Sequence, residues 1–235
     1  MNNIFEREIM VLGDDFNKLS DKKVLVFGCG GVGGYTIETL ARCGISTIGI
    51  CDNDTVKESN INRQIIALHS TIGQNKVDVM EVRLKDINPD IKVNKYLKFV
   101  TKENINEFDL DSYDYIIDCI DTVSAKVALI KRCKELNIPE LVCLGTGNKL
   151  DPSKFEITDI SKTSYCPLAK SMRTILKKES ISKVNVLYSK EEVKKVTIAE
   201  DGRNIPGSIA FCPSVAGILL ARYVILDLIK KSTID

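Results

Sequence analysis

The sequence predicts an α/β fold, with a Rossmann-like, doubly wound and mainly parallel sheet and an antiparallel extension in the C-terminal part. Up to residue 150, short apolar segments typical of buried strands alternate with longer segments of helical spacing. A glycine-rich turn follows the first apolar segment, as in nucleotide-binding sheets. Beyond residue 151 a segment alternates polar and apolar residues, as antiparallel strands do.

The glycine-rich turn connects a strand expected over residues 24–27 to a helix expected over residues 35–43. The glycines expected to bind a nucleotide phosphate are Gly28, Gly30, Gly31 and Gly33. Glycine permits the tight turn and a close backbone approach to phosphate, and the helix start offers free N–H groups. The next apolar run, residues 45–51, ends at Asp52, where an acidic side chain would meet a ribose. The turn therefore predicts a nucleotide-binding site, and at this point the nucleotide could be either NAD or ATP.

The remaining segments continue the alternation. Helices are expected over residues 73–87, 124–136, 167–178 and 213–231, and strands over 91–99, 113–120, 138–144, 154–160 and 183–188. Since parallel strands end at one edge of a sheet, Gly28, Asp52, Asp121 and Gly145 should converge on one crevice. Residues 1–150 form the expected nucleotide-binding part. Residues 151–235 are expected to complete the same domain, with a mobile loop over 189–207.

Composition and charge describe an ordinary cytoplasmic protein with a basic second half. The chain has 235 residues, 44% of them hydrophobic and 28% charged, and no apolar signal core. The apolar run 215–229 contains Arg222 and Asp227, so we expect a buried helix and no membrane span. Residues 162–235 hold 13 Lys and Arg against 7 Asp and Glu. This excess suits a polyanionic partner, although a solvated lysine-rich surface would give the same count.

None of the eight cysteines is spaced as CxxC, which argues against a tetrathiolate zinc site. Cys166 and Cys212 lie outside the nucleotide half and have no histidine or other base nearby in sequence. We therefore interpret both as structural. The single histidine, His69, lies in a polar loop and is not expected to be catalytic.

Several charged and polar side chains near the expected crevice suit phosphoryl chemistry. They are Asp52, Asn60, Arg63, Lys76 and Asp121. When a carboxylate attacks the α-phosphate of ATP, negative charge builds on the phosphoryl oxygens and on the departing pyrophosphate. Arg63 and Lys76 would stabilise that charge, and Asp121 would hold Mg²⁺. Hydride transfer by an NAD-dependent oxidoreductase would not require Arg63, Lys76 and Asp121. A non-catalytic nucleotide sensor would not require them either.

Motifs across residues 5–150 resemble the ubiquitin-activating-enzyme-like superfamily, which includes the ThiF and MoeB activators of sulfur-carrier proteins. They are residues 28–33, Asp52-x-Asp54, residues 60–64, Gly73-x-x-Lys76, residues 87–89 and Asp118-x-x-Asp121. The resemblance implies acyl-adenylate formation with ATP and Mg²⁺. It implies a cofactor-binding set that comprises the turn glycines with Asp52, Asp54, Asn60, Arg63, Gln64, Lys76 and Asp121. It also implies a homodimer in which Arg7 of one subunit reaches the ATP of the other.

Motifs in the second half narrow the resemblance to the tRNA threonylcarbamoyladenosine dehydratases. They are residues 147–152, 159–163, 167–173, 186–191 and 207–208. The resemblance implies that ATP activates the threonine carboxylate of N6-threonylcarbamoyladenosine at position 37 of tRNA, and that an internal nucleophile then closes a ring with loss of water. It also implies basic side chains that face tRNA phosphates. These are Lys162, Lys170, Arg173, Lys177 and Lys178.

An adenylating activator of a ubiquitin-like sulfur carrier shares the first 150 residues and is the alternative function. Such activators commonly carry paired CxxC zinc motifs or a cysteine nucleophile, and this sequence lacks the CxxC motifs. Cyclisation within one substrate needs no enzyme nucleophile, because the attacking group is tethered and its effective concentration is high. We therefore predict dehydratase activity. A sulfur-transfer or carrier protein as a partner is not excluded.

Overall fold

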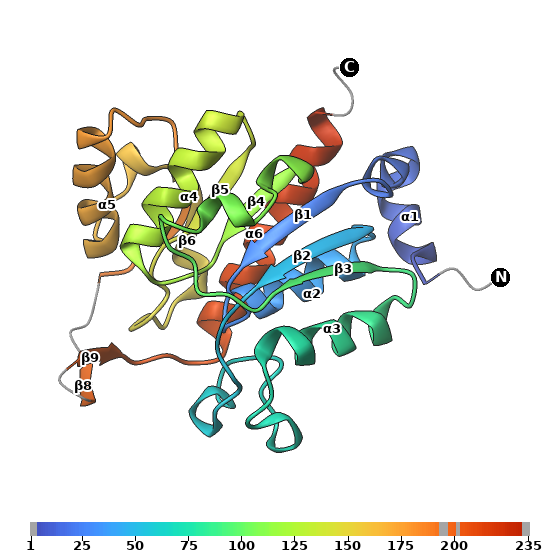
Figure 1. Cartoon of the computed structure of the whole chain (residues 1–235), viewed down its shortest axis with the longest axis horizontal. Coiled ribbons are helices and arrows are strands. Elements are labelled where there is room, and N and C mark those ends of the chain that lie inside the picture. The colour runs from blue at the N-terminus through green and yellow to red at the C-terminus, as the bar shows by residue number, and fades with distance from the viewer. Residues whose placement is uncertain (1–3, 193–196, 201–202, 232–235) are drawn as a thin grey trace.

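The computed structural model describes residues 4–192, 197–200 and 203–231. A central seven-stranded sheet has the strand order β3-β2-β1-β4-β5-β7-β6, and helices cover both of its faces (Figure 1). All neighbouring strands in it are parallel except β7 and β6, which are antiparallel. The predicted doubly wound fold with an antiparallel C-terminal extension is therefore confirmed.

The elements have the following bounds. The strands of the sheet are β1 (Lys23–Phe27), β2 (Thr47–Cys51), β3 (Lys92–Tyr96), β4 (Tyr115–Asp118), β5 (Glu140–Cys143), β6 (Phe155–Asp159) and β7 (Asn185–Ser189). The helices are α1 (Glu6–Leu12), α2 (Gly33–Arg42), α3 (Lys76–Ile87), α4 (Val123–Leu136), α5 (Pro167–Lys178) and α6 (Phe211–Lys231). A separate antiparallel pair consists of β8 (Thr197–Glu200) and β9 (Arg203–Pro206).

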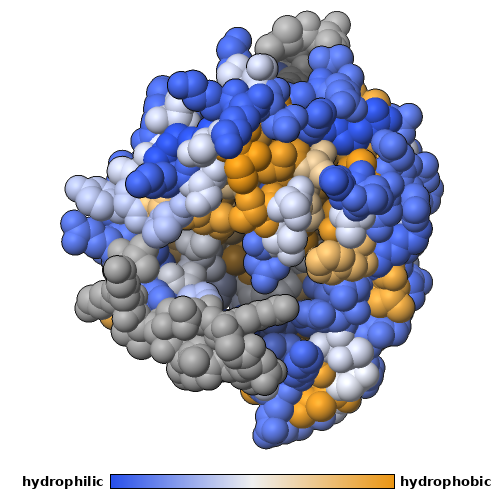
Figure 2. Space-filling model, turned by 60° about the vertical axis from the view of Figure 1, so that its left-hand side comes forward, coloured by the Kyte–Doolittle hydropathy of each residue, from blue (hydrophilic) through white to orange (hydrophobic). Residues whose placement is uncertain are grey.

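The chain winds outward from the middle of the sheet in two directions. It passes from β1 through β2 to β3 on one side, and from β4 through β5 to β7 on the other. One buried cluster contains residues of α2, α3 and α6. Two others contain residues of α4, and one of these also contains residues of α5. The winding reverses between β1 and β4, and ligands of such sheets bind at this reversal. In the space-filling view, hydrophobic side chains gather near a hollow in a largely hydrophilic face (Figure 2).

Helix α6 is long and apolar enough to cross a membrane by composition, but it packs inside the molecule along α2. A Cβ at Gly217 would lie 2.4 Å from the Val32 carbonyl oxygen, so only glycine permits this approach. The Thr36 hydroxyl donates a hydrogen bond of 3.1 Å to the Gly217 carbonyl. Leu220 and Val224 are fully buried. The apolar run 215–229 is thus part of a core helix, as expected.

Several expected elements differ from the structure by a few residues at their ends, and two differences have a clear physical reason. Helix α3 begins at Lys76 and not at residue 73, because Gly73 has a left-handed φ of 84° and its N–H donates to the Val56 carbonyl. The loop expected over 189–207 contains β8 and β9, which pair with each other. Residues 193–196 and 201–202 of that loop lie outside the described residues. Alternation in so short and polar a hairpin is too weak to separate it from a loop.

Candidate active site

A cavity of about 980 Å³ lies at the carboxyl ends of β1, β2 and β4, next to the reversal of the winding. The residues predicted for nucleotide binding that line it are Gly28, Gly30, Asp52, Asp54, Asn60, Arg63, Gln64, Lys76 and Asp121. They come from the ends of three strands, the segment 57–64 and the start of α3. The sheet therefore brings together residues that are up to 93 positions apart in the sequence, Gly28 and Asp121 being the extremes.

The glycine turn has two positions that only glycine can occupy. Gly28 has a φ of 95°, and a Cβ there would lie 2.9 Å from the Cys119 carbonyl oxygen. A Cβ at Gly33 would lie 1.7 Å from the Gly28 carbonyl oxygen, so Gly33 allows α2 to start directly against the turn. A Cβ at Gly30, which lines the cavity, would be 3.9 Å from its nearest neighbour. Gly31 packs against Pro213, and neither Gly31 nor Gly33 lines the cavity.

Asp52 forms a hydrogen bond to the glycine turn and also lies close to Lys76. Its Oδ2 accepts a hydrogen bond of 2.7 Å from the Cys29 N–H, and its Oδ1 accepts one of 2.8 Å from the Asp54 N–H. Lys76 Nζ lies 2.9 Å from Asp54 Oδ2 and 4.0 Å from Asp52 Oδ1. Lys76 is only 5% exposed and lines the cavity, so its ammonium lies between these two carboxylates with little access to bulk solvent.

Arg63 is held in place by its own segment. Its Nη1 donates to the Ser59 carbonyl at 2.9 Å and to Asn62 Oδ1 at 2.8 Å. Burial lowers the pKa of Arg63, yet a guanidinium stays protonated at neutral pH. Gln64 is buried, and its Oε1 has no hydrogen-bond partner in the described part of the chain. A buried polar atom of this kind fits a site that a ligand or water completes.

The two aspartates of the Asp118-x-x-Asp121 motif have different surroundings. Asp121 is exposed at the cavity, and its Oδ1 accepts only a long hydrogen bond of 3.4 Å from Thr122. Asp118 is buried and pairs with Lys126 at 3.0 Å. Burial raises the pKa of the Asp118 carboxyl, and the nearby Lys126 ammonium opposes that rise. Asp121 is therefore the aspartate of the motif whose carboxylate lies exposed at the cavity.

Comparison with known proteins assigns this arrangement to a family. The sequence pattern of the ThiF family matches residues 5–233. The chain belongs to the ThiF family. A relative from Bacillus subtilis (strain 168), "tRNA threonylcarbamoyladenosine dehydratase", is 41% identical over 241 residues, which cover 96% of this chain and 94% of the relative.

Solved structures agree with this membership. The ATP complex of the Escherichia coli tRNA N6-threonylcarbamoyladenosine dehydratase has a TM-score of 0.90 and 31% identity, covering 97% of this chain and 95% of that one. Its AMP complex has a TM-score of 0.88 and 32% identity, covering 97% and 94%. The resemblance that the sequence motifs indicated is therefore confirmed along nearly the whole chain.

Other predicted residues of this ThiF-family chain lie away from the cavity. Arg7 is exposed on α1 and is not among the residues that line the cavity. The predicted tRNA-facing residues lie on α5 and in the segment before it. Lys162, Lys170, Lys177 and Lys178 are exposed. Arg173 differs, because it is half-buried and its guanidinium donates to the carbonyl and the hydroxyl of Thr163.

Sequence reasoning missed several residues that line the cavity. Lys57, Ser59 and Asn62 belong to the polar segment that also supplies Asn60 and Arg63, and that shared position was the available signal. Lys98, Phe99 and Val100 follow β3 and line another part of the wall. Pro206 and Ser208 come from the far end of the chain, and the motif at residues 207–208 gave no sign that this segment reaches the cavity.

The two cysteines outside the nucleotide half have structural contacts. Cys212 is buried, its Sγ donates to the Lys149 carbonyl at 3.1 Å, and burial raises the pKa of its thiol. Cys166 Sγ accepts from the Ala169 N–H at 3.4 Å and caps the start of α5. A raised pKa disfavours the thiolate, which is the nucleophilic form. The surroundings of Cys212 therefore do not favour the thiolate that thioester formation needs.

Proposed function

We propose that this chain is an ATP-dependent tRNA threonylcarbamoyladenosine dehydratase. The observation that carries the proposal is the convergence of Arg63, Lys76 and Asp121 on one cavity beside the glycine turn. This set suits attack of a carboxylate on ATP. The dehydratases from Bacillus subtilis and Escherichia coli match this chain over almost its full length, and the second was solved with ATP and with AMP.

The proposed reaction has two steps. A threonine carboxylate oxygen attacks the α-phosphorus of ATP, and the bond to pyrophosphate breaks. An internal nucleophile of the modified base then attacks the acyl carbon, and AMP leaves with the former carboxylate oxygen. Arg63 and Lys76 stabilise the phosphoryl and pyrophosphate charge, and the backbone at Gly28 and Gly30 approaches the phosphates. Asp52 with Asp54, Asn60 and Gln64 orient the nucleotide, and ring closure needs no enzyme nucleophile.

Mg²⁺ fits the acidic residue at the cavity. No cluster of three or more His, Cys, Asp or Glu side chains that could hold a metal occurs among the described residues. Mg²⁺ does not need one, because it usually combines one or two carboxylates with substrate phosphates and water. Asp121 has an exposed carboxylate at the cavity and would supply that ligand. The ion would neutralise charge on the phosphates.

The exposed basic residues of the second half are candidates for contacting tRNA. Lys170, Lys177 and Lys178 lie on α5, and Lys162 precedes it. Lysines at such positions neutralise backbone phosphates and make binding salt-dependent. Arg173 would contribute less, because its guanidinium already bonds to Thr163. We expect the protein to work in the cytoplasm, where its tRNA substrate would be.

We further propose a homodimer in which Arg7 serves the partner's cavity. Arg7 is exposed on α1, and its neighbours Met10 and Val11 are each 82% exposed, as apolar residues at a subunit contact would be in an isolated chain. Mixed dimers of Arg7→Ala and Lys76→Ala chains should regain about one working site, because one cavity would then hold both residues. Turnover no higher than in either parent dimer would show that Arg7 does not act across subunits.

Mass spectrometry of tRNA nucleosides tests the main proposal. Purified protein with ATP and Mg²⁺ should convert the linear modified nucleoside to a product lighter by one water, and release AMP and pyrophosphate. An unchanged nucleoside would refute the dehydratase. The alternative, activation of a ubiquitin-like sulfur carrier, would instead give pyrophosphate exchange that needs the carrier and ignores tRNA.

A further inference from the structure

Asn62 lies between the arginine at the cavity and the far end of the chain. Its Oδ1 accepts from Arg63 Nη1 at 2.8 Å, and its Nδ2 donates to the Ser208 carbonyl at 3.0 Å. Chemistry fixes this orientation of the amide, because a guanidinium only donates and a carbonyl only accepts. A rotation of Asn62 that breaks one bond therefore also breaks the other.

The segment around Ser208 is in turn fixed to the loop after β5. The Gly207 N–H donates to Asn148 Oδ1 at 2.7 Å, and the Asn148 N–H donates to the Gly207 carbonyl at 2.8 Å. Asn148 has a left-handed φ of 56°, a conformation that asparagine tolerates better than most residues. A Cβ at Gly147 would lie 2.9 Å from Pro206, so the two segments are in close contact.

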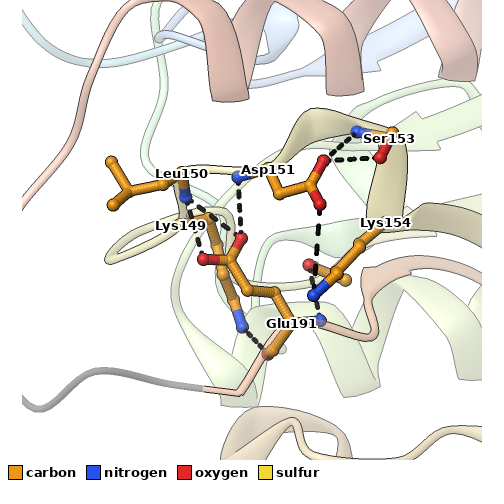
Figure 3. Close-up of polar contacts among 7 residues, drawn as sticks. Lys149, Leu150, Asp151, Ser153, Lys154 and Glu191 are labelled. Carbon is orange, nitrogen blue, oxygen red and sulfur yellow. Dashed lines mark hydrogen bonds and ion pairs between the residues drawn. The ribbon is translucent and has the colours of Figure 1, made fainter.

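The same loop after β5 also forms hydrogen bonds with Glu191, which precedes the β8–β9 pair. The Glu191 carboxylate accepts hydrogen bonds from the Leu150 N–H at 3.0 Å and the Asp151 N–H at 2.9 Å (Figure 3). The Lys149 ammonium donates to the Glu191 carbonyl (Figure 3). Thus Glu191 and Gly207 both attach to residues 148–151, which provide a fixed base for Ser208.

From these contacts we infer that Asn62 is a positioning residue, which orients the Arg63 guanidinium and couples it through Ser208 to the loop at Asn148. Arg63 matters here as the phosphate-side cation of the proposed function, on which this inference rests. Asn62 orients the guanidinium of Arg63 through its side-chain oxygen. The Asn148–Gly207 pair fixes the backbone at Ser208, to which the side-chain amide of Asn62 is bonded. The second half of the chain thereby helps to set the affinity of the first half for ATP.

Double-mutant cycles on ATP affinity test this coupling, because they need no tRNA. Asn62→Ala should weaken ATP binding by a factor between about two and a hundred, the range for coupled neighbours. In an Arg63→Ala background it should cause no further loss. An equal loss in both backgrounds, or no loss in either, would overturn the inference. Asn17→Ala, at an exposed asparagine outside the cavity lining, is the control and should bind ATP normally.

A second cycle tests the connection to the loop. Asn148→Gly keeps the left-handed backbone and removes only the side-chain acceptor. It should weaken ATP binding in the wild-type background and have no effect in an Asn62→Ala background. Unchanged ATP affinity in the single variant would overturn the coupling to the second half. Normal ATP binding with an unconverted tRNA nucleoside would refute the dehydratase and leave both cycles interpretable, whereas loss of all ATP binding by the wild type would overturn both proposals.

Discussion

The ammonium of Lys126 lies 3.0 Å from Oδ1 of Asp118, and neither side chain is more than 2% exposed. Lys126 also donates to the Cys143 carbonyl at 2.7 Å, so it joins the carboxyl ends of β4 and β5. Asp118 ends β4 three positions before Asp121, which faces the cavity. A buried ion pair of this kind contributes little net stability, but the loss of one partner leaves a buried charge uncompensated.

Removal of the Lys126 charge should therefore destabilise the fold. We expect Lys126→Met to lower the free energy of unfolding by about 3–5 kcal/mol. Urea unfolding would measure the change. Lys131→Met is the matched control on the same helix, because its pair with Glu179 is exposed and should be worth no more than about 1 kcal/mol. Equal effects in the two variants would contradict a special role for the buried pair.

The deficit of Lys126→Met should depend on pH. Burial raises the pKa of the Asp118 carboxyl, and the variant lacks the ammonium that opposes this rise. A carboxyl whose folded-state pKa exceeds its unfolded value favours folding below the unfolded pKa, and this contribution is lost as pH rises through the folded pKa. The deficit relative to wild type should thus be smaller at about pH 5 than at about pH 8 in urea unfolding. A deficit that grows toward acid would show that Asp118 is not the group responsible.

Two glycines of the turn should respond differently to the same substitution. Gly33→Ala should prevent the native turn, since its Cβ would lie 1.7 Å from the Gly28 carbonyl oxygen. We expect the free energy of unfolding to fall by roughly 3 kcal/mol or more. ATP binding should be lost as well. Gly30→Ala brings its Cβ only into ordinary contact with Gln64, at 3.9 Å, and should keep the wild-type melting temperature while weakening ATP binding. Thermal unfolding and ATP titration separate the two, and a well-folded Gly33→Ala that binds ATP would contradict the turn geometry.

Lys76 should be needed for nucleotide binding more than for folding. Lys76→Met removes the cation beside Asp52 and Asp54 and leaves two carboxylates facing the ATP phosphates. We expect turnover to fall by about a hundredfold or more, as for loss of one preorganised charge donor. Lys85→Met, on the same helix but outside the cavity, should keep wild-type rates in the nucleoside assay. Similar rates for both variants would remove Lys76 from the phosphate site.

Cys212 should be dispensable and slow to react. Burial raises the pKa of its thiol above the ordinary value, so little thiolate forms near neutral pH. Iodoacetamide at about pH 7.5 should label Cys212 far more slowly in the native protein than after denaturation, as peptide mass spectrometry would show. Cys212→Ala should keep dehydratase turnover within about twofold of wild type. Loss of turnover with retained folding would instead favour a thioester route.

Local pattern was sufficient to locate the nucleotide half of the site. Asp52 directly follows β2, and Asp121 lies three positions after the end of β4. Because parallel strands end at one edge of a sheet, the meeting of these two residues at the cavity could be predicted. Arg63 and Lys76 could be predicted from the polar segment and the helix that follow β2. The Asp118–Lys126 pair could not be predicted, because the spacing of a helix does not indicate whether a lysine ammonium points into the protein.

The sequence by itself determined the fold class, the order of strands and helices up to residue 150, and which strand ends carry polar groups. These properties depend on side-chain periodicity and on residues adjacent in the chain. Only the tertiary structure decided that Gly30 lines the cavity while Gly33 packs against the Gly28 carbonyl, and that Ser208 reaches Asn62. Such contacts join segments up to 146 positions apart, and they form only when packing brings the segments together.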